Sequence, residues 1–177
     1  MDMNDTGAPP SQAELDEAAM NMARNMFQAA RTGDVAHLEA YLSRGFPANM
    51  RNEKGDGLLM LASYHGHLDA TRVLLEHGAD PHMINDAGQT PLQGAAFKGD
   101  LPVATLLLDK GAQPDFAGPS GRTALMFAAM FNRVAIAQML MDRGADPAAR
   151  DAGGVTAYDA ALRMGAPDTA ALLAPPV

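Results

Sequence analysis

Histidine is the residue type whose spacing in this chain first suggests metal chemistry. Four of the five histidines fall within one short stretch, at His65, His67, His77 and His82. A helical zinc site needs two ligands four residues apart, because that spacing brings them to one face of the helix. His65 and His67 are two residues apart, so their side chains cannot share a helix face. We therefore predict no metal ion and no other cofactor.

Nucleophilic catalysis is the second chemistry that the residue types could suggest. The chain has no cysteine, which excludes a thiolate nucleophile, a thiolate metal site and a disulfide bond. None of the serines lies in the elbow motif of a serine hydrolase; they are Ser11, Ser43, Ser63 and Ser120. Ser63 lies in an apolar helical stretch, where a serine is expected to bond within its own helix. Catalysis by serine or cysteine is therefore not expected.

Carboxylates and glycines complete the search for a reactive site. Glu53, Asp56 and Asp86 fall in turn-rich segments. Water surrounds a carboxylate there, so burial does not raise its pKa toward the value that acid–base catalysis needs. Gly153 and Gly154 also belong to a turn, not to a phosphate-binding loop that follows a strand. We therefore predict that the protein is not an enzyme.

A fixed interval of 33 residues, the separation of Gly55 and Gly88, organises the chain. Three glycine series keep it: Gly55, Gly88, Gly121 and Gly154; Gly45, Gly78, Gly111 and Gly144; and Gly33, Gly66, Gly99 and Gly165, with Asn132 as the exception. A threonine series, Thr90, Thr123 and Thr156, has the same interval. Such a period is typical of a solenoid, whose units are too small to bury their own apolar faces and therefore stack on their neighbours.

The copy at residues 85–117 shows what each unit must be. Gly88 marks a turn, because glycine accepts a positive φ angle. Thr90-Pro91 is typical of a helix start, since the threonine hydroxyl can accept a first-turn N–H and proline is tolerated at the first helical position. Gly99 ends this helix, and Gly111 ends a second one. Each copy is therefore predicted to be a turn, a helix, a turn and a helix.

With these features placed, the chain resembles the ankyrin repeat family. The copy at 85–117 carries T-P-L, A-A, a glycine, L-L-L and G-A, and similar blocks are GLLMLASYHGHLDATRVLLEHGAD, GRTALMFAAMFNRVAIAQMLMDRGAD and GVTAYDAALRMG. Together they cover about Met22–Leu173. The resemblance implies an all-α fold, an ankyrin-repeat solenoid of about five helix-turn-helix units with β-turn fingers on one side.

The chain also departs from the family pattern. Gly57-Leu58 replaces Thr-Pro and should weaken one helix start without changing the fold. Gln93 replaces the usual histidine, and the positions where the family often has asparagine hold His82, Asp115 and Ala148. His67 stands in a helix-connecting turn where the family commonly has a histidine. The resemblance therefore implies a local hydrogen bond for His67, while His65 should point outward.

We predict one ankyrin-repeat domain over residues 11–174, with repeats at about 19–51, 52–84, 85–117, 118–150 and 151–174, a disordered tail at 1–10 and a short tail at 175–177. Ser11 and Glu14 have the spacing of a capping box, so a helix should begin there and run into the first repeat. The first and last repeats should be irregular caps, because each has one face in water. Proline at the C-terminal end forbids further helix.

Composition narrows the classes of partner. The formal charge of −8 opposes binding to nucleic acid, which requires cationic side chains that displace counterions from phosphates. The N-terminal residues lack the basic and apolar regions of a secretory signal, and no apolar run approaches the length of about 18 residues that suggests a membrane span. We expect a cytoplasmic monomer whose partner is a protein, not a nucleic acid or a membrane.

The repeat period also predicts which surface is free to bind. Large side chains directly after the Ala-Ala pair form two columns along the concave side: Tyr64, Phe97, Met130 and Arg163 in one, and His65, Lys98, Phe131 and Met164 in the other. The turn tips add Glu53, Lys54, Asp56, Asp86, Gln89, Ser120 and Arg122. One helical turn earlier, Met60 and Met126 should be packed, and Leu61 and Phe127 should form the floor of a groove. In the ankyrin family, partners usually touch the positions of the two columns and the turn tips.

We therefore predict a non-catalytic protein–protein interaction module that binds a protein partner through the concave inner-helix face and the turn tips. Its size and alanine-rich composition resemble small stand-alone bacterial ankyrin repeat proteins, some of which are inhibitors or helpers of another protein. The alternative is a small-molecule or metal-binding stress or regulatory protein. A different interpretation of the surface is that Phe97, Met130 and Phe131 only cover the inner helices.

Overall fold

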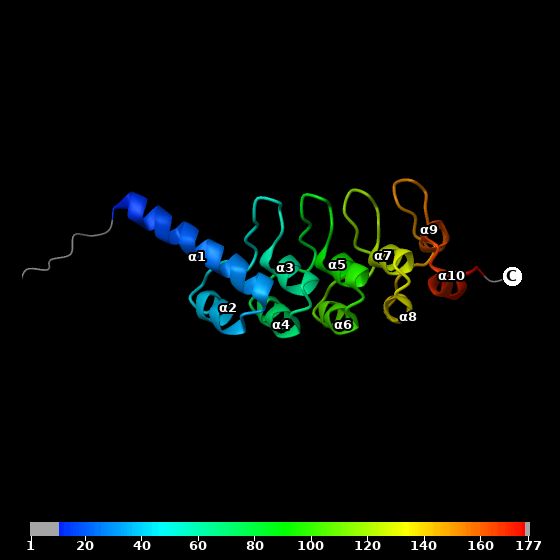
Figure 1. Cartoon of the computed structure of the whole chain (residues 1–177), viewed down its shortest axis with the longest axis horizontal. Helices are drawn as coiled ribbons and strands as arrows, with labels where there is room; N and C mark the ends of the chain where they lie inside the picture. Colours follow the sequence, from blue (N-terminus) through cyan, green and yellow to red (C-terminus); the bar gives the residue numbers. More distant parts are fainter. Residues whose placement is uncertain (1–10, 176–177) are drawn as a thin grey trace, which may run out of the picture.

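The computed structural model describes residues 11–175, and this part of the chain is a row of helix pairs (Figure 1). Within it there are ten helices and no named strand: α1 (Gln12–Thr32), α2 (Val35–Leu42), α3 (Leu58–Tyr64), α4 (Leu68–Glu76), α5 (Pro91–Lys98), α6 (Leu101–Asp109), α7 (Ala124–Met130), α8 (Val134–Asp142), α9 (Ala157–Met164) and α10 (Pro167–Leu173). The predicted all-α solenoid is therefore confirmed. The tail predicted at 1–10 and residues 176–177 of the C-terminal tail lie outside the described residues.

The helices form two layers, with loops projecting from one side (Figure 1). The inner helices α3, α5, α7 and α9 pack on one another in chain order, and α1 packs on α3. The outer helices α2, α4, α6, α8 and α10 form the second layer. The projecting loops contain four fingers, which we define as residues 52–57, 85–90, 118–123 and 151–156 and number in chain order. Fingers and inner helices therefore share one side of the molecule, the inner-helix face.

The core repeats with the sequence period. Four alanines, Ala62, Ala95, Ala128 and Ala161, have no exposed surface, which allows neighbouring inner helices to approach closely. The outer helices contribute a parallel series of buried leucines, at Leu74, Leu107, Leu140 and Leu173. Each repeat thus buries its apolar face against its neighbours, as a solenoid requires.

Threonine side chains start most of the inner helices. Thr90, Thr123 and Thr156 each accept the backbone N–H three residues further on, which satisfies a donor that the helix itself cannot. Gly57 stands at the start of α3 and offers no side-chain cap. The helix forms nevertheless, because all residues from Leu58 to Ser63 are buried and packing outweighs the missing bond.

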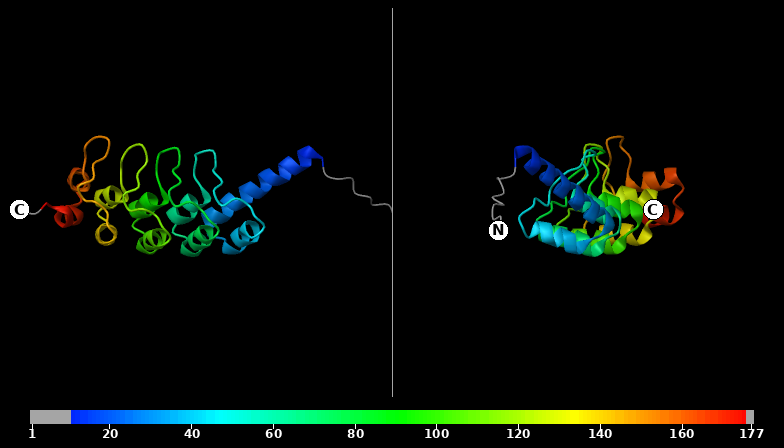
Figure 2. Two further views of the ribbon diagram at one scale, coloured as in Figure 1. Left: turned by 180° about the vertical axis from the view of Figure 1, so that it is seen from behind. Right: turned by 60° about the vertical axis from the view of Figure 1, so that its left-hand side comes forward.

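Helix α1 is continuous from the predicted capping box into the first helix pair. Ser11 and Glu14 make both bonds of that box, and the helix runs for 21 residues. Its first residue with a buried side chain is Met26. The preceding part projects beyond the stack toward the side of the fingers (Figures 1 and 2). The predicted continuity is confirmed, and α1 occupies the place that a finger takes in later repeats.

Three different side chains perform one task at the positions where the family often has asparagine. Asn49 Oδ1 accepts the N–H of Asp80 at 2.8 Å, and His82 Nε2 accepts that of Gln113 at 3.0 Å. An oxygen of Asp115 accepts the equivalent N–H of the next repeat at 3.0 Å. Each bond ties a loop to the loop after it, so these substitutions keep the function of the family residue.

In three of the four fingers, the side-chain oxygen of the first residue accepts backbone N–H groups of the same finger and so closes the turn. Asn52, Asn85 and Asp151 each accept backbone N–H groups two and four residues further on. The third finger has Gly118 at this position. A Cβ atom added to Gly118 would lie 2.1 Å from the carbonyl oxygen of Gly88. The second and third fingers therefore approach too closely for any side chain here.

Replacing Gly118 by asparagine, the residue of the first two fingers, is expected to lower the free energy of unfolding by about 1–3 kcal/mol. The substitution offers the turn a side-chain acceptor but forces the Gly88 backbone away. Chemical denaturation would measure the loss, with Ala87→Asn at an exposed turn position as the control. An unchanged or increased stability for Gly118→Asn would show that the close approach of the fingers is unimportant.

Asp151 should make the fourth finger sensitive to acid. The N–H groups of Val155 and Gly153, with Arg122 nearby, hold the pKa of this carboxyl below its usual value. Because the folded pKa is below the unfolded one, the carboxylate stabilises the fold above the ordinary aspartate pKa, and this contribution disappears as the pH falls through the folded pKa. As the pH falls below the ordinary aspartate pKa and through the lower folded pKa of Asp151, we expect the amide NMR signals of Val155 and Gly153 to shift.

The control for this titration is Asp151→Asn. Asparagine at Asn52 and Asn85 already makes the same turn bonds, so the variant should keep the finger closed at neutral pH and lose the acid shift. An acid transition of equal size in Asp151→Asn would mean that another group causes it.

Candidate functional site

Aromatic rings form a continuous row on the inner-helix face. The rings of Tyr64 and Phe97 are stacked, with centroids 6.2 Å apart, and Phe97 meets Phe131 edge-on at 4.5 Å. The row crosses from one predicted column to the other. Phe97 lies within α5, whereas Phe131 is the C-cap residue that follows α7. Asn132, with a φ angle of 56°, follows at once.

The ring row is partly embedded in the protein. Phe97 and Phe131 are half-buried and pack against the core, whereas 37% of Tyr64 is exposed. These rings therefore cover the inner helices and also offer a face to solvent. That a partner binds this face stays a prediction. Such rings are rigid, so little side-chain freedom is lost when a partner contacts them.

The remaining members of the two columns differ in exposure. His65, Lys98, Arg163 and Met164 are exposed, and Met130 is half-buried. The ammonium group of Lys98 lies 5.2 Å from the centre of the Tyr64 ring, within range of a cation–π contact. Arg163 and Met164 lie in the last inner helix and belong to the opposite end of the face.

The floor of the face is more deeply buried than predicted. Met60 and Met126 are packed, as expected, with 6% and 2% of their surface exposed. Leu61 and Phe127 are also buried, at 8% and 9%. Leu61 lines the groove described next, but Phe127 does not, because that groove does not extend to α7. The prediction that Phe127 forms part of the floor is therefore corrected.

A groove of about 1020 Å³ lies between α1, the first two fingers, α3 and α5. It brings together seven of the predicted residues: Glu53, Lys54, Asp56, Tyr64, His65, Gln89 and Phe97. A smaller hollow beside it, of about 360 Å³, adds Lys98. The other predicted residues, Met130, Phe131, Arg163, Met164, Asp86 and Arg122, do not line the groove.

One wall of the groove was missed at the sequence level. It consists of Arg24, Phe27, Gln28 and Arg31 from α1, with Arg51 from the loop before the first finger. The signal was present, because residues 24, 27, 28 and 31 have the spacing of one helix face. We treated this helix only as a cap, and its use as a wall depends on the angle at which it leaves the stack.

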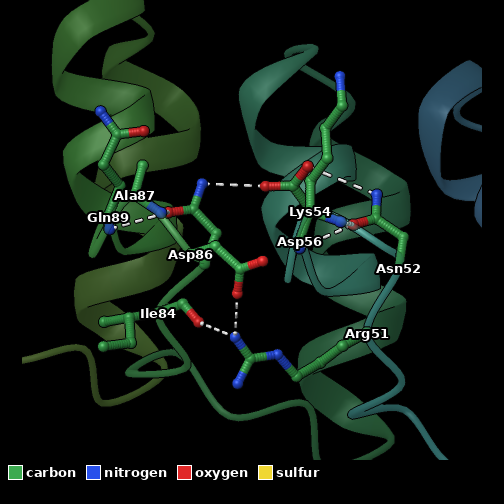
Figure 3. Close-up of polar contacts among 9 residues, drawn as sticks. Arg51, Asn52, Lys54, Asp56, Ile84, Asp86, Ala87 and Gln89 are labelled. Atoms are coloured by element: carbon green, nitrogen blue, oxygen red, sulfur yellow. Dashed lines mark hydrogen bonds and ion pairs between the residues drawn. The ribbon is translucent and has the colours of Figure 1, made fainter.

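The finger tips hold one another in place (Figure 3). Arg51 donates to the carbonyl of Ile84 at 3.0 Å and to the carboxylate of Asp86 at 3.3 Å. Asp56 accepts the amide N–H of Asn85 at 2.9 Å. Two of the predicted tip residues, Asp56 and Asp86, are therefore also structural, since they connect the first finger to the second.

The other tip residues take no part in these side-chain contacts between the first two fingers. The side chain of Lys54 extends away from these contacts (Figure 3). Glu53, Gln89 and Ser120 are exposed. Arg122 lies 3.6 Å from the carboxylate of Asp151, an ion pair between the third and fourth fingers. The tips thus combine a fixed backbone with several available polar side chains.

The histidines have separate structural roles. His67 donates from Nε2 to the carbonyl of Arg31 at 2.9 Å, so its side chain is hydrogen-bonded as predicted, but to the preceding repeat and not locally. His77 contacts Glu39 across the outer helices at 3.1 Å. Among residues 11–175 there is no group of three His, Cys, Asp or Glu side chains that could hold a metal ion. Nor does this part of the chain contain a helix that is long and apolar enough to cross a membrane.

This architecture defines an α-helical repeat scaffold whose inner-helix face is edged by fingers. The family model for ankyrin repeats, in three copies, matches residues 26–117 and 95–176. The chain therefore belongs to the ankyrin repeat family, as its sequence predicted. A relative from Pseudomonas aeruginosa, itself described as an ankyrin repeat protein, is 50% identical over 60 residues. The matched segment spans 34% of this chain and 35% of that relative. Ankyrin repeats are general protein–protein interaction modules.

Proposed function

We propose that this chain is a non-catalytic module that binds one protein partner through its inner-helix face and finger tips. The observation that supports the proposal most strongly is the groove beside the row of Tyr64, Phe97 and Phe131. These rings are half-buried or partly exposed, and Tyr64 and Phe97 line the groove together with polar residues of the first two fingers. Aromatic anchors inside a polar rim are the usual composition of a protein interface.

The scaffold explains why such a site can be rigid without being enclosed. Inner helices pack on one another throughout the stack, and the first two fingers are tied by Arg51, Asp56 and Asn85. A partner therefore meets a surface that is already ordered, which reduces the entropic cost of binding. As part of the same proposal, the module acts as an inhibitor or helper of its partner in the cytoplasm.

Affinity capture tests this proposal. The full chain, immobilised and exposed to a lysate of its source cells, should retain a protein that a Phe97→Ala, Phe131→Ala variant does not retain. The captured protein must then bind the purified chain at an equimolar ratio in solution. Equal capture by the chain and by the variant would place binding on another surface.

A further inference from the structure

The groove between α1 and the first finger has a charge opposite to that of the whole chain. The sequence contains 13 Lys and Arg against 21 Asp and Glu. The groove is lined by four of these cationic residues, Arg24, Arg31, Arg51 and Lys54, and by two acidic ones, Glu53 and Asp56. Cationic side chains are therefore concentrated where the rest of the surface is acidic.

Most of these cations lack a carboxylate partner within the described part of the chain. Arg24 donates to the side-chain oxygen of Asn21 at 3.0 Å, and Arg31 donates weakly to that of Gln28 at 3.5 Å. Lys54 has no ion pair among residues 11–175. Only Arg51 is paired, with Asp86. Three exposed cations are thus available to a ligand.

Among residues 11–175, the two acidic residues of the groove form no ion pair with these cations. Asp56 is occupied, because its carboxylate accepts side-chain N–H groups of Asn52 and Asn85. Glu53 lies exposed in the first finger. The lining therefore holds four cationic side chains against two carboxylates, and its net charge is positive.

The base of the groove is apolar. Met60 and Leu61 lie at the bottom with little exposed surface, and the rings of Phe27, Tyr64 and Phe97 line it at partial exposure. An apolar side chain entering here would lose its contact with water and pack on aromatic surface, which favours binding. The groove therefore combines cationic side chains, which attract an anionic group, with an apolar base, which accommodates an apolar side chain.

We propose that this groove binds an acidic segment of the partner protein, with an aromatic or aliphatic side chain inserted between Tyr64, Phe97 and Phe27. Arg24 and Arg31 receive carboxylates of that segment, since a guanidinium group can bind a carboxylate through two parallel hydrogen bonds. The net negative charge elsewhere repels an acidic segment, so it is directed to this groove alone. This inference rests on the proposed function and specifies the partner's chemistry.

Selection from a library of short displayed peptides against the full chain tests the proposal. We expect enrichment of peptides in which Asp or Glu flanks an aromatic or aliphatic residue. A fluorescein-labelled enriched peptide should bind Arg24→Gln, Arg31→Gln roughly tenfold more weakly or worse, and high salt should weaken its binding to the unaltered chain. Glutamine is chosen in place of glutamate because a carboxylate near the C-terminus of α1 would destabilise the helix through its unfavourable interaction with the helix dipole.

The matched control is Arg44→Gln, Arg72→Gln, which removes the same charge from exposed positions outside the groove and should leave affinity unchanged. Enriched peptides that lack acidic residues but need Phe97 and Phe131 would overturn the acidic-segment proposal and leave the proposed function standing. A chain that enriches no peptide but still captures a protein through Phe97 and Phe131 would likewise overturn the acidic-segment proposal and leave the proposed function standing. Strong tightening on removal of residues 1–10 would assign the groove to that acidic segment of the chain itself and also overturn the proposal.

Discussion

Replacing Gln93 by methionine is expected to lower the free energy of unfolding by about 2–4 kcal/mol, although methionine occupies the same position in both neighbouring repeats, at Met60 and Met126. Only 2% of Gln93 is exposed. Its Oε1 accepts the N–H of Thr90 at 3.0 Å, and its Nε2 donates to the carbonyl of Arg122 at 2.6 Å. Methionine fills the same space but makes neither bond.

The third finger is the reason that this repeat needs an amide. In the first, second and fourth fingers, the backbone N–H of Asn52, Asn85 or Asp151 donates to the carbonyl four residues further on. The corresponding bond from Gly118 to Arg122 is missing from the described structure. Gln93 supplies the donor that Arg122 would otherwise lack. Its substitution therefore leaves a carbonyl and a helix-start N–H unsatisfied, which is costly.

Denaturant unfolding monitored by circular dichroism measures this loss. Gln89→Met, four residues away and exposed, makes the same chemical change outside the core and should leave stability within about 0.5 kcal/mol. A loss for Gln93→Met no larger than this would mean that water replaces the amide without cost.

Truncating both Phe97 and Phe131 to alanine should weaken partner binding by roughly a hundredfold or more, because aromatic anchors near the centre of an interface carry most of its binding energy. The two rings contact each other at 4.5 Å, so a partner that packs on one also depends on the other. Calorimetric titration with the captured partner gives the affinity directly.

These rings also pack on the core, so their removal should cost about 1–2 kcal/mol of stability each. The control must therefore reproduce that cost. Leu75→Ala, Leu108→Ala removes two half-buried side chains that pack on the same core from outer helices α4 and α6. It should destabilise the fold to a similar extent and leave binding unchanged. Equal loss of affinity in both variants would mean that stability, not contact, causes the effect.

The repeat period made most of the fold predictable. Each glycine or threonine that recurs every 33 residues has one local task, a turn, a helix end or a helix start, and the structure places it accordingly. The buried alanines and leucines follow the same interval because each unit packs on a neighbour of the same architecture. Continuity of α1 was also readable, since its capping box and apolar spacing are local features.

The site was less predictable because it depends on contacts between repeats. The ring row crosses the predicted columns at Phe131, which contacts Phe97 of the preceding inner helix. The bond from Gln93 depends on a finger that lacks its own closing bond, 29 residues further on. The cationic wall depends on the direction in which α1 leaves the stack. None of these can be obtained from one repeat considered alone.

The most direct test of the proposed binding face is photo-crosslinking to the captured partner from defined positions. A photoreactive phenylalanine analogue would be introduced at Tyr64 or Phe97 on the inner-helix face, and at Leu75 or Leu108 on the outer helices. The proposal predicts crosslinks to the partner from positions 64 and 97 and none from 75 and 108. Crosslinks from the outer helices, with none from the inner-helix face, would contradict it.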